Sequence, residues 1–191
     1  MTHDLPTDLL STTHAAGLDF EAYVATDPKR APDWRAIHER TTLTPSRRTL
    51  IEGFVRRLNV IVVSGTWCGD CVQQGPLLAR IAEASDLIDL RWVDRDEQPE
   101  LASRVRINGG DRVPVAVFMN EFFEPVSILG DRTLNRYRAI AARNLGPSCP
   151  LPNAPVADSE LDDTLQDWLD EFERVQLLLR LSPRLRAHHG D

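Results

Sequence analysis

The chain has 191 residues, which is enough for one domain with a hydrophobic core. Its formal net charge of -7 argues against nucleic acid or anionic membranes as partners, because both repel a net anion. The first residues lack the basic start and apolar run of a signal peptide, and no segment approaches the roughly 18 apolar residues of a membrane span. We therefore expect a cytoplasmic protein.

Residues 1–44 are predicted to form a helical N-terminal extension. Three short segments in it have helical patterns, and each is too short to be stable alone in water. They are Thr7–Ala16, Asp19–Ala25 and Asp33–Arg40. We expect these helices to pack against the rest of the protein.

Residues 45–146 are predicted to form an α/β domain. It begins with an amphipathic helix, Pro45–Leu58, followed by a strand, Asn59–Ser64, whose run of β-branched residues indicates burial on both faces. The remaining predicted elements alternate between helix and strand. They are helix Cys68–Ala84, strand Leu87–Asp94, helix Gln98–Val105, strands Val113–Met119 and Pro125–Leu129, and helix 131–145, with Asp131 as its cap.

The order of these elements predicts the strand directions. Alternation of strand and helix favours parallel pairing through right-handed crossovers. The last two strands are close enough in sequence for an antiparallel hairpin.

Residues 147–191 are predicted to be a proline-rich linker and a long C-terminal helix, Ser159–Leu181. Ser159 and Asp162 resemble a capping box at its start. The apolar stripe of this helix favours packing on the same domain over docking of a partner. The tail after Pro183 is expected to fray.

The most informative motif is Trp67-Cys68-Gly69-Asp70-Cys71. Two cysteines three residues apart lie on the same side of a helical turn and can form a disulfide. Cys68 falls where a strand ends and a helix begins, so free N–H groups and the helix dipole favour its thiolate. A thiolate is the nucleophile of disulfide exchange, and Cys71, one turn further in, is placed to attack a mixed disulfide.

Two other interpretations of the cysteine pair remain open. A zinc site needs about four ligands, and the five histidines show no ligand spacing. The pair could also be two buried structural cysteines. The preceding strand and following helix favour redox chemistry. Cys149, the third cysteine, is interpreted as an incidental linker thiol, with a third redox role as the alternative.

Residues 54–145 resemble the thioredoxin family. The Trp67-Cys68-x-x-Cys71 segment is similar to the family's active-site motif, and Pro76 matches the proline inside its active-site helix. Val113-Pro114 resembles the family's cis-proline segment, which faces the two cysteines. Gly130 falls where the family often has glycine. The resemblance implies a thioredoxin-like fold, with a central mixed sheet flanked by helices.

The resemblance also implies an activity, thiol–disulfide exchange. Cys68 and Cys71 would be catalytic, with no metal and no cofactor beyond the Cys68–Cys71 disulfide. The residues expected to bind substrate share proximity to this pair. They are Trp67, Gly69, Asp70, Val113 and Pro114. A protein or small-molecule disulfide would be the substrate, and a reductant such as a thioredoxin reductase-like enzyme would reset the pair.

Three departures from the family pattern stand out. Asp70 replaces the usual proline, and its charge is expected to disfavour the Cys68 thiolate and make the pair more reducing. Val62 occupies the position of the family's buried acid, and the family's first strand has no counterpart. The alternative function is therefore a thioredoxin-fold binding or adaptor module whose redox pair is secondary or regulatory.

Overall fold

Four strands in the middle of the chain form one mixed sheet. They are β1 (Leu58–Ser64), β2 (Ile88–Asp94), β3 (Val115–Met119) and β4 (Pro125–Gly130), in the spatial order β2-β1-β3-β4. The computed structural model describes residues 4–145 and 156–191. All seven residues of β1 are buried, as its β-branched run predicts.

The strand directions confirm part of the prediction and correct the rest. β1 and β2 are parallel, with Leu58 opposite Ile88, and β3 and β4 form the expected antiparallel hairpin. However, β3 is antiparallel to β1, so the predicted parallel crossover between β2 and β3 is wrong. Helix α6 (Pro99–Arg104) spans only about 9 Å, too short to carry the chain back along a strand of about 23 Å.

The edge of β2 has no N-terminal strand beside it in the described part of the chain. Leu18 alone forms a bridge there, with hydrogen bonds of 2.9 and 2.8 Å to the backbone of Trp92. The expected absence of the family's first strand is therefore confirmed, apart from this one-residue bridge.

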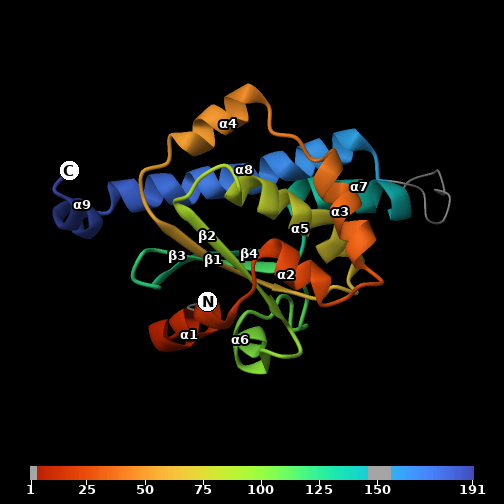
Figure 1. Cartoon of the computed structure of the whole chain (residues 1–191), viewed down its shortest axis with the longest axis horizontal. Helices are drawn as coiled ribbons and strands as arrows, with labels where there is room; N and C mark the ends of the chain where they lie inside the picture. The colour runs from red at the N-terminus through yellow and green to blue at the C-terminus, as the bar shows by residue number, and fades with distance from the viewer. Residues whose placement is uncertain (1–3, 146–155) are drawn as a thin grey trace.

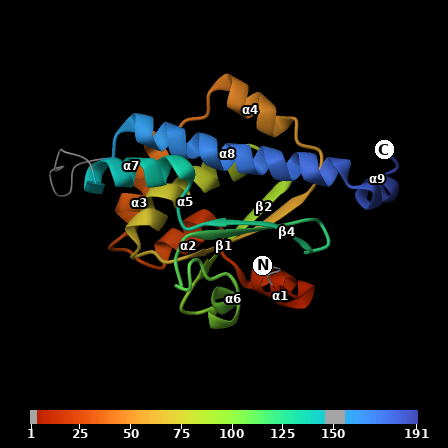
Figure 2. The same ribbon diagram turned by 180° about the vertical axis from the view of Figure 1, so that it is seen from behind.

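Helices cover both faces of the sheet (Figures 1 and 2). On one side lie α3 (Ala31–Arg40), α5 (Gly69–Ala82), α7 (Leu134–Leu145) and α8 (Asp158–Leu181), with α5 packed between α3 and α8. On the other side lie α1 (Thr7–Ala16) and α6. The remaining helices are α2 (Phe20–Ala25), α4 (Pro45–Glu52) and α9 (Pro183–His189).

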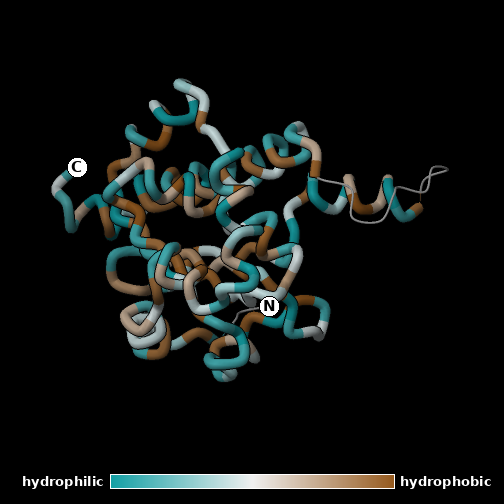
Figure 3. Tube along the Cα trace, turned by 45° about the vertical axis from the view of Figure 1, so that its right-hand side comes forward, coloured by the Kyte–Doolittle hydropathy of each residue, from teal (hydrophilic) through white to brown (hydrophobic). Residues whose placement is uncertain are grey.

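One hydrophobic core includes side chains from all three segments predicted above. Trp34 of α3, Trp92 of β2 and Trp168 of α8 are each buried in it. Figure 3 shows hydrophobic and hydrophilic residues alternating along the chain, as expected for elements with one face toward a core. The N-terminal helices and α8 thus contribute to the same core as the sheet. The segment boundaries at residues 44 and 146 stay predictions.

The helix that follows residue 44 is shorter than predicted. It ends at Glu52, with Gly53 as its C-cap, and Leu58 is the first residue of β1. Val55, which falls inside the predicted helix, is exposed. The apolar residues after Gly53 therefore lead the chain into the sheet and do not extend the helix.

Two predicted helix starts and the predicted frayed tail also differ in the structure. The Thr133 hydroxyl, not Asp131, accepts from the N–H of Arg136 at 3.5 Å at the start of α7. Ala157 is the N-cap of α8, so the predicted Ser159 capping box is wrong. The tail forms α9, because the Ser182 hydroxyl caps it by accepting from the N–H of Leu185, which is itself buried.

Two further statements concern the extent of the structure. Residues 146–155, which include most of the predicted linker and Cys149, lie outside the described residues. Among the described helices, none combines the length and apolar content needed to cross a membrane.

The packing of α5 against α3 generates a stability prediction. A Cβ atom added at Gly75 would lie 2.3 Å from a ring carbon of the buried Trp34. We expect Gly75→Ala to lower the free energy of unfolding by about 1–3 kcal/mol, because the indole has no space to move into. Denaturant unfolding followed by circular dichroism measures this.

Gly69 in the same helix supplies the control. A Cβ there meets no atom within 4 Å, so Gly69→Ala is expected to be neutral or slightly stabilising. Equal stability of the two variants would contradict the packing described here.

Candidate active site

The two motif cysteines lie at the junction of β1 and α5. Cys68 is the N-cap of α5, with an extended backbone (φ -81°, ψ 124°), and its carbonyl accepts from the N–H of Val72 at 2.9 Å. Cys71 lies in the first turn of the helix. Cys68 is half-buried and Cys71 is fully buried, and both are free thiols. Only the first cysteine is therefore open to a substrate.

The environment of Cys68 favours its thiolate. The pKa of Cys68 is lowered to about 6, chiefly by a hydrogen bond from the Cys71 side chain. Partial burial opposes this effect, and the backbone N–H groups of Cys71 and Asp70 add to it. These are the unpaired N–H groups of the first helical turn, which stabilise an anion at the helix N-terminus.

The environment of Cys71 has the opposite effect. Burial raises the pKa of Cys71 well above its usual range, and the neighbouring Cys68 raises it further. The Ser64 hydroxyl and the Gly65 N–H partly offset this. Near neutral pH the pair therefore consists of one thiolate and one thiol.

Two buried hydroxyl groups lie behind Cys71. Ser64 is fully buried at the end of β1, and Tyr23 of α2 lies beyond it with a pKa raised by burial. Neither hydroxyl has a hydrogen bond of normal geometry within the described residues. By the family resemblance, Val62 stands at the position of the family's buried acid, and it is buried and apolar. Polar groups behind Cys71 are therefore supplied by the hydroxyls of Ser64 and Tyr23.

The N-terminal helices hold the loop that precedes Cys68. The Trp34 indole N–H donates to the Thr66 carbonyl at 3.1 Å, and the Thr66 hydroxyl donates to Asp27 at 3.1 Å. The loop therefore has partners on both its backbone and its side chain. The sequence predicts these helices as an extension that could cover the site, but nothing local in it pairs Trp34 or Asp27 with Thr66.

The segment Val113-Pro114 faces the cysteines. Its peptide bond is cis, as the resemblance predicts, and the Cys68 Sγ lies 3.6 Å from the Val113 carbonyl. Gly130 stands beside this segment, where an added Cβ would come within 2.5 Å of the Pro114 carbonyl. A larger residue at 130 would push the segment away from Cys68.

Asp70 is paired with two arginines, so its charge disfavours the Cys68 thiolate less than the sequence predicts. Its carboxylate accepts from Arg132 at 2.9 and 2.6 Å and from Arg136 at 3.1 Å. The charge of Asp70 still opposes the Cys68 thiolate, but it is the smallest of the effects on that pKa. The two guanidinium groups offset most of an isolated carboxylate's effect.

The same arginines connect the motif to the C-terminal helix. Arg136 also donates to Glu160 of α8 at 2.5 Å, and Arg143 of α7 donates to Glu160 at 2.5 Å. These residues were not predicted to belong to the site: Arg132 precedes α7 and Arg136 lies in its first turn. Nothing local in the sequence pairs them with Asp70.

The remaining predicted site residues lie at the surface around Cys68. Trp67 is 46% exposed, with the Arg95 guanidinium 4.8 Å from its ring centroid, and Gly69 is exposed. Among the described residues, no His, Asp or Glu lies close enough to the two cysteines to form a three-ligand group suited to a metal. The exposed surface thus offers an aromatic ring and open backbone next to the thiolate.

The sequence model of the thioredoxin family matches residues 17–141. This chain belongs to the thioredoxin family. The match includes α2 and α3 and so is longer than the resemblance noted over residues 54–145. No curated protein matches this thioredoxin-family chain.

Solved structures share the fold at low sequence identity. An HIV epitope-scaffold protein has 17% identity and a TM-score of 0.62, covering 84% of this chain and 96% of its own. A protein of unknown function from Pseudomonas aeruginosa has 18% identity and a TM-score of 0.61, covering 85% and 95%. Both likenesses extend over most of the chain and include more than a minimal thioredoxin domain.

The acidity of Cys68 generates a prediction for this thioredoxin-family protein. The rate of alkylation by iodoacetamide is expected to rise with pH around a midpoint of about 6, whereas an ordinary cysteine thiol has a midpoint near ~8.5. Cys71→Ala should raise the midpoint, because the hydrogen bond from Cys71 is the largest cause of the shift. Mass spectrometry of a Cys149→Ser protein measures both rates, and a midpoint near that of a free thiol in both proteins would contradict the prediction.

The pairing of Asp70 generates a second prediction. Replacing both Arg132 and Arg136 by Gln should raise the alkylation midpoint of Cys68 by between about half and one pH unit, because it leaves the nearby Asp70 carboxylate uncompensated. Adding Asp70→Asn should return the midpoint toward its original value. Arg138→Gln, which changes an arginine whose guanidinium contacts Asn135, is the matched control and should have no effect. A midpoint that stays high after Asp70→Asn would show that the arginines act by another route.

Proposed function

We propose that this protein is a thiol–disulfide oxidoreductase that reduces disulfides through a Cys68–Cys71 cycle. The observation that carries the proposal is the opposite acidity of the two thiols. Cys68 is half-buried with a pKa lowered to about 6, while Cys71 is buried with a pKa raised well above its usual range. Cys68 is thus a thiolate that can attack a substrate disulfide, whereas Cys71 stays protonated until the second step.

The reaction balances in two exchange steps. The Cys68 thiolate attacks one sulfur of a substrate disulfide, forming a Cys68–substrate disulfide and releasing the other sulfur as a thiolate, which takes up a proton. Cys71 then loses its proton and attacks Cys68 Sγ, forming the Cys68–Cys71 disulfide and releasing the second substrate thiolate. The substrate gains the two electrons that the dithiol loses.

The surroundings of Cys68 support a role in binding substrate. The exposed ring of Trp67 and the open backbone at Gly69 leave room for an extended chain, and Val113 lies in contact with Cys68. A protein or small-molecule disulfide fits this surface. The cycle needs no cofactor besides the pair itself, and a cytoplasmic dithiol reductant, such as a thioredoxin reductase-like enzyme, would reset it.

A second candidate is a binding module on a thioredoxin fold. It is favoured by the apolar Val62 at the position of the family's buried acid and by exposed leucines near the end of α8, of which Leu181 is 74% exposed. In that case the disulfide would regulate binding and would not turn over.

A thiol-trapping titration in graded redox buffers tests the proposal. Purified full-length Cys149→Ser protein is expected to show a single reversible two-electron transition, and Cys68→Ser should abolish it. Cys71→Ser should instead accumulate a mixed disulfide with substrate, because the second step is blocked.

Turnover distinguishes the two candidates. Catalytic reduction of a disulfide reporter in the presence of excess dithiol, lost in Cys68→Ser, supports the oxidoreductase. A reversible Cys68–Cys71 disulfide without turnover supports the binding module. Failure to form any Cys68–Cys71 disulfide contradicts both.

A further inference from the structure

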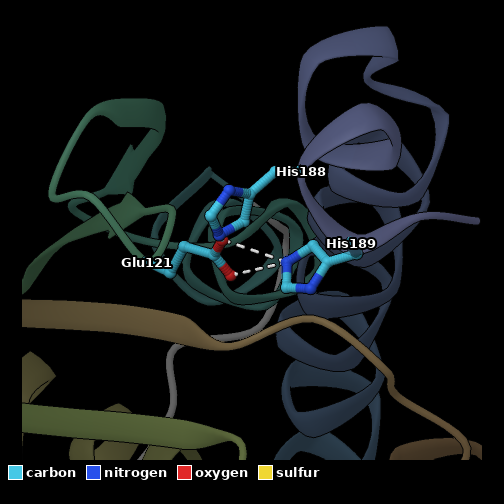
Figure 4. A group of neighbouring side chains, drawn as sticks. All are labelled: Glu121, His188 and His189. Atoms are coloured by element: carbon cyan, nitrogen blue, oxygen red, sulfur yellow. Dashed lines mark hydrogen bonds and ion pairs between the residues drawn. The ribbon is translucent and has the colours of Figure 1, made fainter.

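A second group of chemistry-bearing side chains lies far from the cysteines. Glu121 is in the turn between β3 and β4, and His188 and His189 are the last two residues of α9. Figure 4 shows both imidazole rings turned toward the Glu121 carboxylate. The ligand atoms of these three residues all lie within 4.8 Å of one another.

The group lies at the opposite end of the sheet from the redox pair. Met119, two residues before Glu121, is paired with Asn59 near the start of β1, whereas Cys68 follows the end of β1. The two places are therefore separated by about 20 Å, the length of that strand. A ligand at this group would not contact Cys68 or Cys71.

His188 and His189 both point toward Glu121, although neighbouring residues of a regular helix face different directions. Consecutive residues of a helix point in directions about 100° apart and do not normally face one target. Here the helix ends at His189, with Gly190 in the left-handed region (φ 76°). His188 Nε2 lies 3.6 Å from Glu121 Oε1, and His189 Nε2 lies 3.0 Å from the same oxygen.

Glu121 is held in place for this contact. In its turn, the Asn120 side-chain carbonyl accepts from the N–H of Phe122 at 2.9 Å and from that of Glu124 at 3.0 Å. The Glu121 side chain is only 15% exposed, and its ion-pair partners within the described residues are the two histidines. A largely buried carboxylate thus faces two imidazole nitrogens and no guanidinium.

These distances match the ligand spacing of a zinc ion. Zinc bonds to imidazole nitrogen and carboxylate oxygen at about 2.0–2.1 Å, so two ligand atoms of a tetrahedral site lie roughly 3.3 Å apart. The two Nε2–Oε1 distances of 3.0 and 3.6 Å lie on either side of that value. His188 is 57% exposed and can rotate to bring its nitrogen into line.

We propose that Glu121, His188 and His189 bind one divalent transition-metal ion, with Zn²⁺ as the preferred occupant. Two imidazoles and one carboxylate suit zinc better than Mg²⁺ or Ca²⁺, which take oxygen ligands. Three protein ligands leave a fourth position for water. The ion would join α9 to the β3–β4 turn and stabilise the folded chain by an amount that grows with the logarithm of the free Zn²⁺ concentration above its Kd.

The neighbouring contacts provide a matched control. Glu124, on the same turn, pairs with Arg184 of α9 and accepts from Asn120. This pair connects the same two elements without offering a ligand to the group. A variant at Glu124 therefore removes one exposed ion pair between these elements while leaving all three ligands.

The experiment is a Zn²⁺ titration of the full chain, made without a polyhistidine tag and carrying Cys68→Ser, Cys71→Ser and Cys149→Ser, so that no thiolate competes. A chromophoric chelator reports the free ion, and thermal unfolding is measured in parallel. We expect one Zn²⁺ per chain at micromolar affinity or tighter, and a melting temperature that rises with Zn²⁺. Glu121→Gln and His189→Gln should each weaken binding by about tenfold or more, whereas Glu124→Gln should leave it nearly unchanged.

Other outcomes would overturn the proposal. No saturable binding by the parent protein would leave the group as a set of histidine–carboxylate ion pairs. Unchanged affinity in Glu121→Gln and His189→Gln would place the ion elsewhere. A stoichiometry of one ion per two chains would mean that the metal is shared between molecules. Circular dichroism of each variant excludes loss of fold as the cause of lost binding.

Discussion

A strand that is buried along its whole length must be covered on both faces, and β1 imposes this requirement on the rest of the chain. Its seven buried residues leave no face for solvent, so helices are needed on each side of the sheet. A domain limited to residues 54–145 supplies α5, α6 and α7. The large side chains of Trp34 and Trp168 come from outside that range and complete the cover. β1 also ends four residues before Cys68, so the place of this buried strand sets the place of Cys68 at the start of α5.

Features that depend on neighbouring residues could be predicted from the sequence. The β-branched run of β1, the C-x-x-C spacing and the start of α5 are all local, and the structure has them where the sequence indicates. The cis bond at Val113-Pro114 was accessible only through the family resemblance, because nothing in two residues reveals the cysteines opposite them. The short α9 escaped prediction because seven residues carry too little periodicity to distinguish a helix from a frayed end.

Features that depend on distant residues were missed or misjudged. Asp70 was assigned an uncompensated charge, but its partners Arg132 and Arg136 are more than sixty residues away in sequence. The direction of β3 was misjudged because the order of helices and strands does not show whether the segment after β2 crosses back along the sheet. The convergence of His188 and His189 on Glu121 likewise depends on how α9 docks, which no spacing rule contains. In each case the missing information is a tertiary relation between segments that are far apart in sequence.

The hydrogen bond from Trp34 to Thr66 has a consequence for how such a protein can be inherited or recombined. The indole fills the space beside Gly75 and at the same time holds the backbone two residues before Cys68. A shuffled gene that kept only the motif-bearing half would therefore lose one wall of its core and one support of its active-site loop together. The smallest unit that can pass between proteins with its redox geometry intact starts well before the first strand.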